Sequence, residues 1–294
     1  MTFLRLRIGT LALISGLATL PVFADDSAQE NPPAPAAQAQ AQNPASTASA
    51  KPNVPDYPEP RTFTLGLYYW ITGPGTNPGI ITGRAATDYE TLSDLGKPKR
   101  TPGIQISIPI SRTGELKFDG FLAKGDGNQT IGPNGPFVLG TQFYTGDQVV
   151  TQYQIEGVKL YLDDLLFPHK FPVAKFRLKS LWEVQYLHIK STIDLPPVTS
   201  GVLATGTKQI ILPELGIAAE YALSRQLLFR VSGAGFGLYH KADIWDADAT
   251  LSYRVRSWEV FAGAKALHFK SSPQATEYFI GTLSGAYAGL RWHW

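Results

Sequence analysis

The sequence predicts an all-β chain: a transmembrane antiparallel β-barrel of about ten strands, preceded by a disordered linker. From residue 60 onward, short segments alternate apolar and polar side chains with a period of two, as β-strands do. Turn-forming residues separate these segments, and aromatic side chains gather near the segment ends, as they do where strands leave a bilayer. Eight or twelve strands are alternative counts, and a soluble barrel with an apolar interior is the alternative fold.

The composition argues against several classes of protein. The 294 residues include no Cys, so the chain forms no disulfide and no thiolate metal site. Lys plus Arg is 26 and Asp plus Glu is 24, a balance that does not favour a nucleic-acid partner. The mean hydropathy of −0.08 suits a barrel with a polar lumen better than a bundle of membrane helices. The sequence contains no phosphate loop, zinc-ligand spacing or nucleophile elbow, and we expect no cofactor.

Residues 1–24 are predicted to be a cleaved signal peptide. Arg5 and Arg7 precede an uncharged apolar stretch, and Val22-Phe23-Ala24 provides the small residues that a signal peptidase favours. An N-terminal membrane anchor is the alternative, but the apolar stretch is short for a membrane span. The sequence therefore indicates export.

Residues 25–59 are predicted to be a disordered linker. They are rich in Ala, Pro and Gln and contain almost no large apolar side chains that could form a core. The segment is either a tether or a passive spacer, and the predicted barrel occupies residues 60–294.

Ten segments have the strand pattern; they lie near residues 63–71, 104–110, 116–122, 148–162, 175–186, 208–223, 227–239, 243–255, 258–270 and 278–294. In the segment 148–162 the alternation changes phase at Gly157, which predicts a β-bulge there. A three-residue loop at 112–114, with Gly114 in the left-handed conformation, would pair Ile110 with Leu116. Long links alternate with short ones along the chain, which predicts loops on one rim and tight turns on the other.

Aromatic residues are predicted to form two girdles at the membrane surfaces. The girdle at the loop-bearing rim would contain Tyr69, Trp70, Tyr239 and Trp245. The girdle at the other rim would contain Phe229, Trp258, Trp292 and Trp294.

Short turns at 224–226 and 256–257 predict the pairing of neighbouring strands. Aligning the apolar faces, with Tyr221 opposite Phe229 and Tyr253 opposite Val260, also places opposite charges against each other on the inward face. The resulting pairs are Glu220 with Arg230, Asp248 with Lys265, and Arg254 with Glu259. Because a barrel of this size is narrow, these pairs predict a lumen plugged by salt bridges.

The C-terminal strand carries a specific pattern. Its alternation continues to the last residue, and its conspicuous side chains are Tyr287, Gly289, Trp292 and the terminal Trp294. This pattern resembles the C-terminal assembly signal of Gram-negative outer-membrane β-barrels, and the chain resembles the small members of that class without matching a subfamily. The resemblance implies location in the outer membrane, with both termini and the short turns in the periplasm.

The same resemblance implies partners. These are outer-membrane lipids and lipopolysaccharide, the barrel-assembly machinery, and a cell-wall or periplasmic contact through the linker.

The function expected from these features is that of an integral outer-membrane protein of structural or surface-interaction type. A narrow pore or small-solute channel is the first alternative. A hydrolase of the protease or lipid A deacylase type is the second, because His188, His240 and His268 fall near the loop-bearing rim and Ser271 follows His268 closely. None of these residues reproduces a known catalytic pattern, so no catalytic residue is predicted.

Overall fold

The computed structural model describes residues 62–73, 76, 78–84, 87–92, 95–111, 113–132, 137–167, 175–195, 203–238, 242–271 and 277–294. The predicted signal peptide (1–24) and linker (25–59) lie outside the described residues. Ten antiparallel strands form the barrel: β1 (Thr64–Thr72), β5 (Pro102–Pro109), β6 (Gly114–Thr130), β9 (Gln148–Phe167), β10 (Phe176–Asp194), β11 (Leu203–Ala222), β12 (Leu227–Leu238), β13 (Ala242–Val255), β14 (Trp258–Lys270) and β15 (Glu277–His293).

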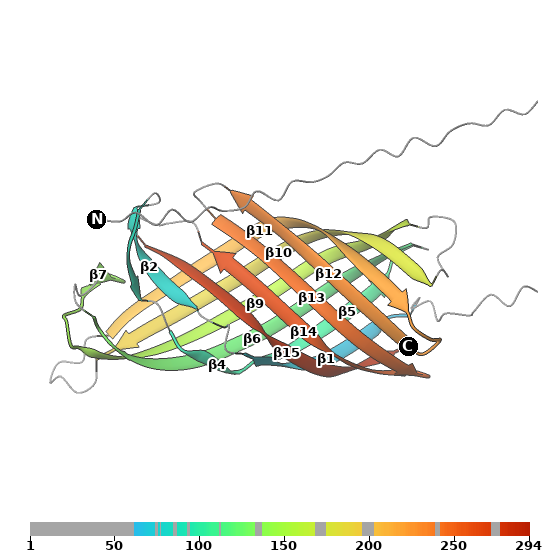
Figure 1. The fold of residues 1–294 in the computed structure, drawn as a ribbon, viewed down its shortest axis with the longest axis horizontal. Coiled ribbons are helices and arrows are strands. Elements are labelled where there is room, and N and C mark those ends of the chain that lie inside the picture. Colours follow the sequence, from blue (N-terminus) through green and yellow to red (C-terminus); the bar gives the residue numbers. More distant parts are fainter. Residues whose placement is uncertain are drawn as a thin grey trace, which may run out of the picture. The chain divides into compact units, whose positions relative to one another are not determined.

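The barrel closes where its first and last strands meet. β1 pairs with β5 on one side and with β15 on the other, from Thr64 opposite His293 to Thr72 opposite Gly285. Every other barrel strand pairs with its neighbours in chain order, and Figure 1 shows the strands tilted around the barrel. The seam between β1 and β15 is thus paired, while β11 pairs with β12 only over Leu215–Ala222. The prediction of a ten-stranded antiparallel barrel is confirmed.

The links separate into two sets. One end of the barrel, here called the turn rim, carries the links 110–113, 168–175, 223–226 and 256–257 together with the C-terminus. The opposite end, the loop rim, carries the longer links, among them 73–101 and 131–147. The loop rim contains five short strands: β2 (Gly79–Arg84), β3 (Thr87–Leu92), β4 (Lys97–Arg100), β7 (Phe137–Val138) and β8 (Thr141–Gln142). Figure 1 shows β2 and β7 at one end and the C-terminus at the other.

The outer surface carries large apolar side chains, with aromatic rings concentrated at the turn rim. Trp258 packs edge-on against Trp292 with ring centroids 4.3 Å apart, and Phe63 lies 5.1 Å from Trp294. The outward face also exposes Leu67, Ile71, Leu160, Trp182, Val184, Ile211, Leu215, Ile217, Leu251 and Val260. Such a surface suits contact with lipid. The described part of the chain contains no helix that is long and apolar enough to cross a membrane.

One residue of the predicted girdles is misplaced, and one cannot be assigned. Trp70 points into the barrel and is buried against Phe121, whereas its neighbour Tyr69 is exposed as predicted. Tyr239 lies outside the described residues. The error for Trp70 arises because adjacent strand residues face opposite sides of a sheet, so Tyr69 and Trp70 cannot both point outward.

Strand registers follow the sequence prediction at two turns and depart from it at one. Tyr221 lies opposite Phe229, and Tyr253 opposite Val260, as predicted. Between β5 and β6, however, Leu116 lies opposite Ile108 and not Ile110. The turn is closed by the Ser111 side chain, which accepts the Gly114 amide at 2.7 Å, and Gly114 does not have a positive φ. A shift of two residues keeps every side chain on its predicted face.

No bulge occurs at Gly157. The pairing of β9 with β6 and β10 runs through this residue without a shift, and the irregularity in β9–β10 lies instead beside Leu178. The phase of β9 is therefore constant, with the odd-numbered residues of Val149–Asp163 facing inward. What changes at Gly157 is the polarity of the two faces.

This polarity change occurs at one level on four neighbouring strands. Phe121, Gly157, Leu187 and Ile210 form a row across β6, β9, β10 and β11. On the turn side of this row the outward residues are apolar and many inward ones are charged. On the loop side the outward residues are polar: Lys124, Asp126, Asn128, Gln152, Gln154, Lys190, Thr192, Thr205, Thr207 and Gln209. There the inward residues are mostly apolar, such as Ile155 and Ile189.

Candidate functional site: the closed lumen

The loop half of the lumen is filled by an apolar core. Trp70 and Phe121 pack edge to face with centroids 5.6 Å apart, and inward side chains of β9, β10 and β11 surround them. Segments of the links contribute fully buried side chains to the same core: Ile80, Leu95, Val138 and Phe143. The barrel is therefore closed at this end by apolar packing, which differs from the expectation of closure by charges alone.

The link before β5 is fastened to the inner wall by polar contacts. The Thr151 hydroxyl donates to the Leu95 carbonyl at 3.0 Å, and the Tyr153 hydroxyl donates to the Gly96 carbonyl at 3.0 Å. Gly96 has a φ of 91°, and a Cβ there would lie 2.1 Å from the Asp126 carbonyl oxygen. Only glycine fits this backbone conformation and this close approach.

The turn half of the lumen holds a network of charges centred on Asp163. This carboxylate is fully buried and contacts Lys117 at 2.8 Å, Lys179 at 3.0 Å and Arg230 at 2.7 Å. Glu220 shares Lys179 and Arg230, at 3.1 and 3.0 Å. Each buried carboxylate is thus held by more than one cation, the condition under which buried charges are tolerated.

Further charged groups close the lumen on the side of β1, β14 and β15. Lys265 donates to Asp119 at 2.9 Å, and Asp119 also accepts the Tyr68 hydroxyl at 2.7 Å. Glu259 contacts Arg291 at 2.6 Å and His293 at 2.8 Å. The contacts of Asp119 with Lys265 and Tyr68 join strands that are not neighbours in the sheet, whereas Glu259 and its two partners lie on the paired strands β14 and β15.

The three charge pairs expected from the sequence have different fates. Glu220 lies opposite Arg230, and their side chains form an ion pair. Asp248 lies opposite Lys265 in register, but Lys265 crosses the lumen to Asp119 and Asp248 accepts the Tyr287 hydroxyl. In a closed barrel inward side chains converge, so a partner across the lumen competes with the residue directly opposite.

A different competition separates Arg254 from Glu259, because β14 also pairs with β15 on its other side and Arg291 lies opposite Glu259 there. The two lie opposite each other in β13 and β14. Glu259 is held instead by Arg291 and His293, while the Arg254 side chain donates to the Arg256 carbonyl at 3.1 Å.

Sequence reasoning missed Lys159, Tyr161 and Asp163 as lumen residues. All three follow Gly157 on the inward face of β9, where they alternate with the outward apolar residues Val158, Leu160 and Leu162. Glu156, directly before the glycine, faces outward and lies 3.4 Å from the His188 ring.

A cavity of about 130 Å³ remains within the charged half. Lys117, Lys159, Glu220, Asp246 and Lys265 are among the residues that line it. Its polar lining and volume suit several water molecules, which would relax the charges around it.

The C-terminal pattern lies at the seam of the barrel. Tyr287 is buried in the lumen, while Trp294 is 60% exposed and its amide donates to the Phe63 carbonyl at 3.0 Å. Trp292 packs between Trp258 and Trp294. A Cβ at Gly289 would lie 2.3 Å from the carbonyl oxygen of Leu67 in β1, so the glycine permits the close contact of β15 with β1.

One histidine on the outward face has polar side chains close to both ring nitrogens. His268 Nδ1 lies 2.9 Å from the Thr282 hydroxyl, and Nε2 lies 3.2 Å from Asp243. Trp245 stacks on the ring with centroids 5.5 Å apart. Ser271, expected near His268, is instead buried and accepts the Phe279 amide. His240 lies outside the described residues.

The chain matches no family model and no curated protein. Solved structures similar to it are Gram-negative outer-membrane β-barrels of varied kinds. The translocator domain of the autotransporter NalP from Neisseria meningitidis has a TM-score of 0.42 and 9% identity, covering 80% of this chain and 89% of that one. The attachment invasion locus protein Ail of Yersinia pestis has a TM-score of 0.35 and 8% identity, covering 79% and 99%. At these values no activity, ligand or partner is transferred from those proteins to this chain.

Proposed function

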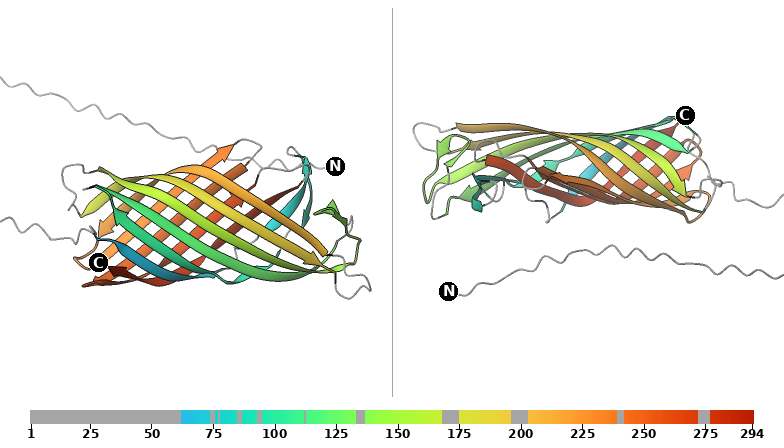
Figure 2. Two further views of the ribbon diagram at one scale, coloured as in Figure 1. Left: turned by 180° about the vertical axis from the view of Figure 1, so that it is seen from behind. Right: turned by 90° about the horizontal axis from the view of Figure 1, so that it is seen from above.

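We propose that this chain is an integral outer-membrane β-barrel with a non-conducting lumen, which presents a β-sheet wall for interactions at the cell surface. The wall is the part of β6, β9, β10 and β11 on the loop side of the polarity change. On β9 it includes Gln148–Glu156, which at about 3.3 Å per residue extends roughly 30 Å along the strand. Figure 2 shows the green and yellow strands running the length of the barrel toward the end that holds β7.

The observation that carries this proposal is the polarity change itself. A strand face that turns from apolar to polar while its inner face becomes apolar indicates that lipid has been replaced by water outside the barrel. The wall is therefore a water-exposed sheet on a rigid base, and its outward side chains are available to a partner. The lumen beneath the wall is filled by the apolar core. A filled lumen argues against a channel.

Because the natural chain has no Cys, single-cysteine labelling tests the orientation. Thr207→Cys lies on the wall and Ser224→Cys at the turn rim, and both native residues are exposed. A membrane-impermeant maleimide should label Thr207→Cys on intact cells and Ser224→Cys only after the outer membrane is permeabilised. Equal labelling of Ser224→Cys on intact cells would contradict the proposed orientation.

Planar bilayers test the lumen. The reconstituted wild type should show no steady conductance, whereas large and stable openings would make the narrow-channel alternative the leading one.

Surface interaction is tested by comparing the retention of cells on immobilised glycans and matrix proteins. A variant with Asn128, Gln152 and Thr207 changed to Ala should lower retention. If cells with and without the wild-type barrel are retained equally, a purely structural role is favoured.

A hydrolase is the second candidate, favoured by the Asp243–His268–Thr282 arrangement. A carboxylate, a histidine and a hydroxyl in this order resemble the relay that activates a nucleophile in many acyl hydrolases, although Asp243 Oδ1 lies 3.2 Å from the ring without forming a hydrogen bond. The candidate predicts release of fatty acid from outer-membrane lipids, lost in both His268→Ala and Thr282→Val. The absence of release by wild-type protein in mixed lipid micelles would remove it.

A further inference from the structure

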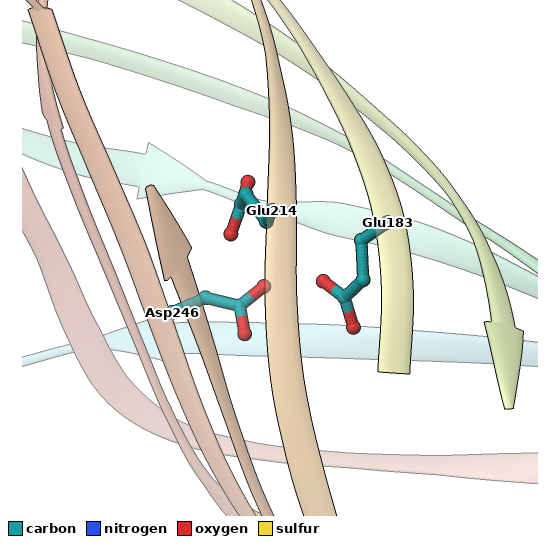
Figure 3. Close-up of side chains that lie close together, drawn as sticks. All are labelled: Glu183, Glu214 and Asp246. Carbon is teal, nitrogen blue, oxygen red and sulfur yellow. The ribbon is translucent and has the colours of Figure 1, made fainter. Parts of the chain in front are cut away.

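Three buried carboxylates meet inside the lumen. Glu183 on β10, Glu214 on β11 and Asp246 on β13 each place a carboxylate oxygen within 4.8 Å of the others. Figure 3 shows the three side chains pointing toward one another. Glu183 and Glu214 lie directly opposite in the β10–β11 register. Like charges in that position repel, so the arrangement requires a compensating group.

The positive charge beside this cluster is insufficient. Lys159 contacts Asp246 and lies 3.3 Å from Glu183, and in the part of the chain that the structure describes it is the one cation paired with any of the three. Three carboxylates and one ammonium leave a formal charge of −2. The other buried lumen carboxylates in the described residues, Asp119, Asp163, Glu220 and Glu259, each contact at least one cation, so this deficit is local.

Glu214 provides a second and independent observation. Its side chain is 1% exposed and is aimed into the cluster, yet neither carboxylate oxygen has a hydrogen-bond partner. A buried carboxylate without a partner carries the full cost of desolvation. Its two free oxygens point to a ligand at the centre of the cluster.

We propose that Glu183, Glu214 and Asp246 bind a divalent cation of the Ca²⁺ type. Carboxylate oxygens are the ligands that hard cations prefer, and Ca²⁺ binds them at about 2.3–2.6 Å. Two oxygens on opposite sides of such an ion are separated by about 5 Å, which accommodates the spacing of the cluster, whereas Mg²⁺ at about 2.0–2.1 Å requires a tighter arrangement. A charge of +2 cancels the local deficit. Glu183 and Asp246 also line the 130 Å³ cavity, from which water would complete the coordination.

A proton is the competing explanation, because protonation of Glu214 would remove one negative charge without an ion. The two explanations are distinguished with full-length mature protein refolded in detergent without lipopolysaccharide, so that no lipid-bound calcium interferes. After treatment with a chelator, CaCl₂ is titrated at pH 7.5 by isothermal calorimetry, and thermal unfolding is followed with calcium or with chelator.

The wild type should bind one Ca²⁺ saturably, and its Tm should rise with calcium. Glu214→Gln keeps the side-chain shape but removes the charge, and should weaken binding at least tenfold and abolish the calcium-dependent rise in Tm. Asp248→Asn is the matched control, because Asp248 is another lumen carboxylate that is held by Tyr287 and Thr250 outside the cluster. It should bind Ca²⁺ within about twofold of the wild type.

Two results would overturn the proposal. One is a wild type that neither binds nor is stabilised by Ca²⁺, in which case Glu214 is neutralised by a proton. The other is equal binding by wild type and Glu214→Gln. If Glu214→Gln does not refold, Glu183→Gln gives the same test from the opposite strand. None of these outcomes depends on whether the wall binds a partner.

Discussion

Replacing Asp163 by Asn removes one negative charge from the lumen while keeping the shape of the side chain. Three cations contact this carboxylate: Lys117, Lys179 and Arg230. The wider network contains four basic groups, since Arg177 contacts Glu220, and three acidic groups, since Glu115 contacts Lys117. The substitution changes this balance from four against three to four against two, and the remaining cations repel one another.

The magnitude follows from what is left unpaired. Removing one member of a buried ion pair costs about 3–5 kcal/mol when its partner remains buried, and Asp163→Asn should lower the free energy of unfolding by about that amount. Arg230→Ala is the informative comparison, because it leaves three basic groups against three acidic ones. With each carboxylate still paired, its cost should be about 1.5–3 kcal/mol, the range for a hydrogen bond to a charged group.

The measurement is equilibrium unfolding by urea in detergent micelles, followed by the fluorescence of the 6 Trp residues. Lys99→Ala is the exposed control, because Lys99 and Asp126 form an ion pair whose side chains are 69% and 44% exposed. It should change the free energy of unfolding by no more than about 0.5 kcal/mol. If Asp163→Asn costs no more than Arg230→Ala, the reasoning from charge balance is wrong.

Three further predictions concern the closure of the barrel. Deleting Trp294 should lower the free energy of unfolding by only about 1 kcal/mol, because it is one aromatic ring among several. The deletion should nevertheless sharply reduce membrane insertion in cells, while refolding in micelles persists. Equal insertion of wild type and deletion in cells would contradict an assembly role. Trp70→Ala should lower the free energy of unfolding by about 3–5 kcal/mol by emptying space beside Phe121, measured by urea unfolding. Gly289→Ala should cost about 1–3 kcal/mol through overpacking against Leu67, and unchanged stability would mean that the seam between β1 and β15 relaxes freely.

The sequence predicts the lipid-facing part of this barrel well. There the environment differs sharply across each strand, so alternation identifies both the strand and its outward face. This is why the registers of β11 with β12 and of β13 with β14 follow from aligning Tyr221 with Phe229 and Tyr253 with Val260.

Prediction fails where the surroundings change along a strand. On β9, Gln154 and Glu156 face outward on the loop side of Gly157, while Tyr153 and Ile155 face an apolar core. Here the apolar side chains face inward and the polar ones outward, the inverse of the arrangement nearer the turn rim. In the sequence, such an exchange of polarity between the two faces looks the same as a one-residue shift in the alternation. A bulge at Gly157 was the local explanation, whereas the structure shows an unbroken strand whose two faces exchange polarity there.

The lumen partners were also beyond sequence reasoning, for a geometric reason. Register arguments pair a residue with its neighbour on the adjacent strand. Lys265, however, reaches Asp119 on a strand that does not adjoin its own, and Asp163 on β9 is reached by Arg230 on β12. Such contacts depend on the diameter of the closed barrel and the lengths of the side chains.

The two closures of the lumen follow from the two environments of the same strands. Where lipid surrounds the barrel, the outward positions must be apolar, and the narrow interior accommodates charges that compensate one another. Where water surrounds it, the outward positions are polar, and the same four strands bury an apolar core that the links 73–101 and 131–147 help to fill. In the proposed orientation, the wall therefore needs no separate domain for its stability, because the same strands continue from the membrane into water and the links that fill their apolar core also close the barrel.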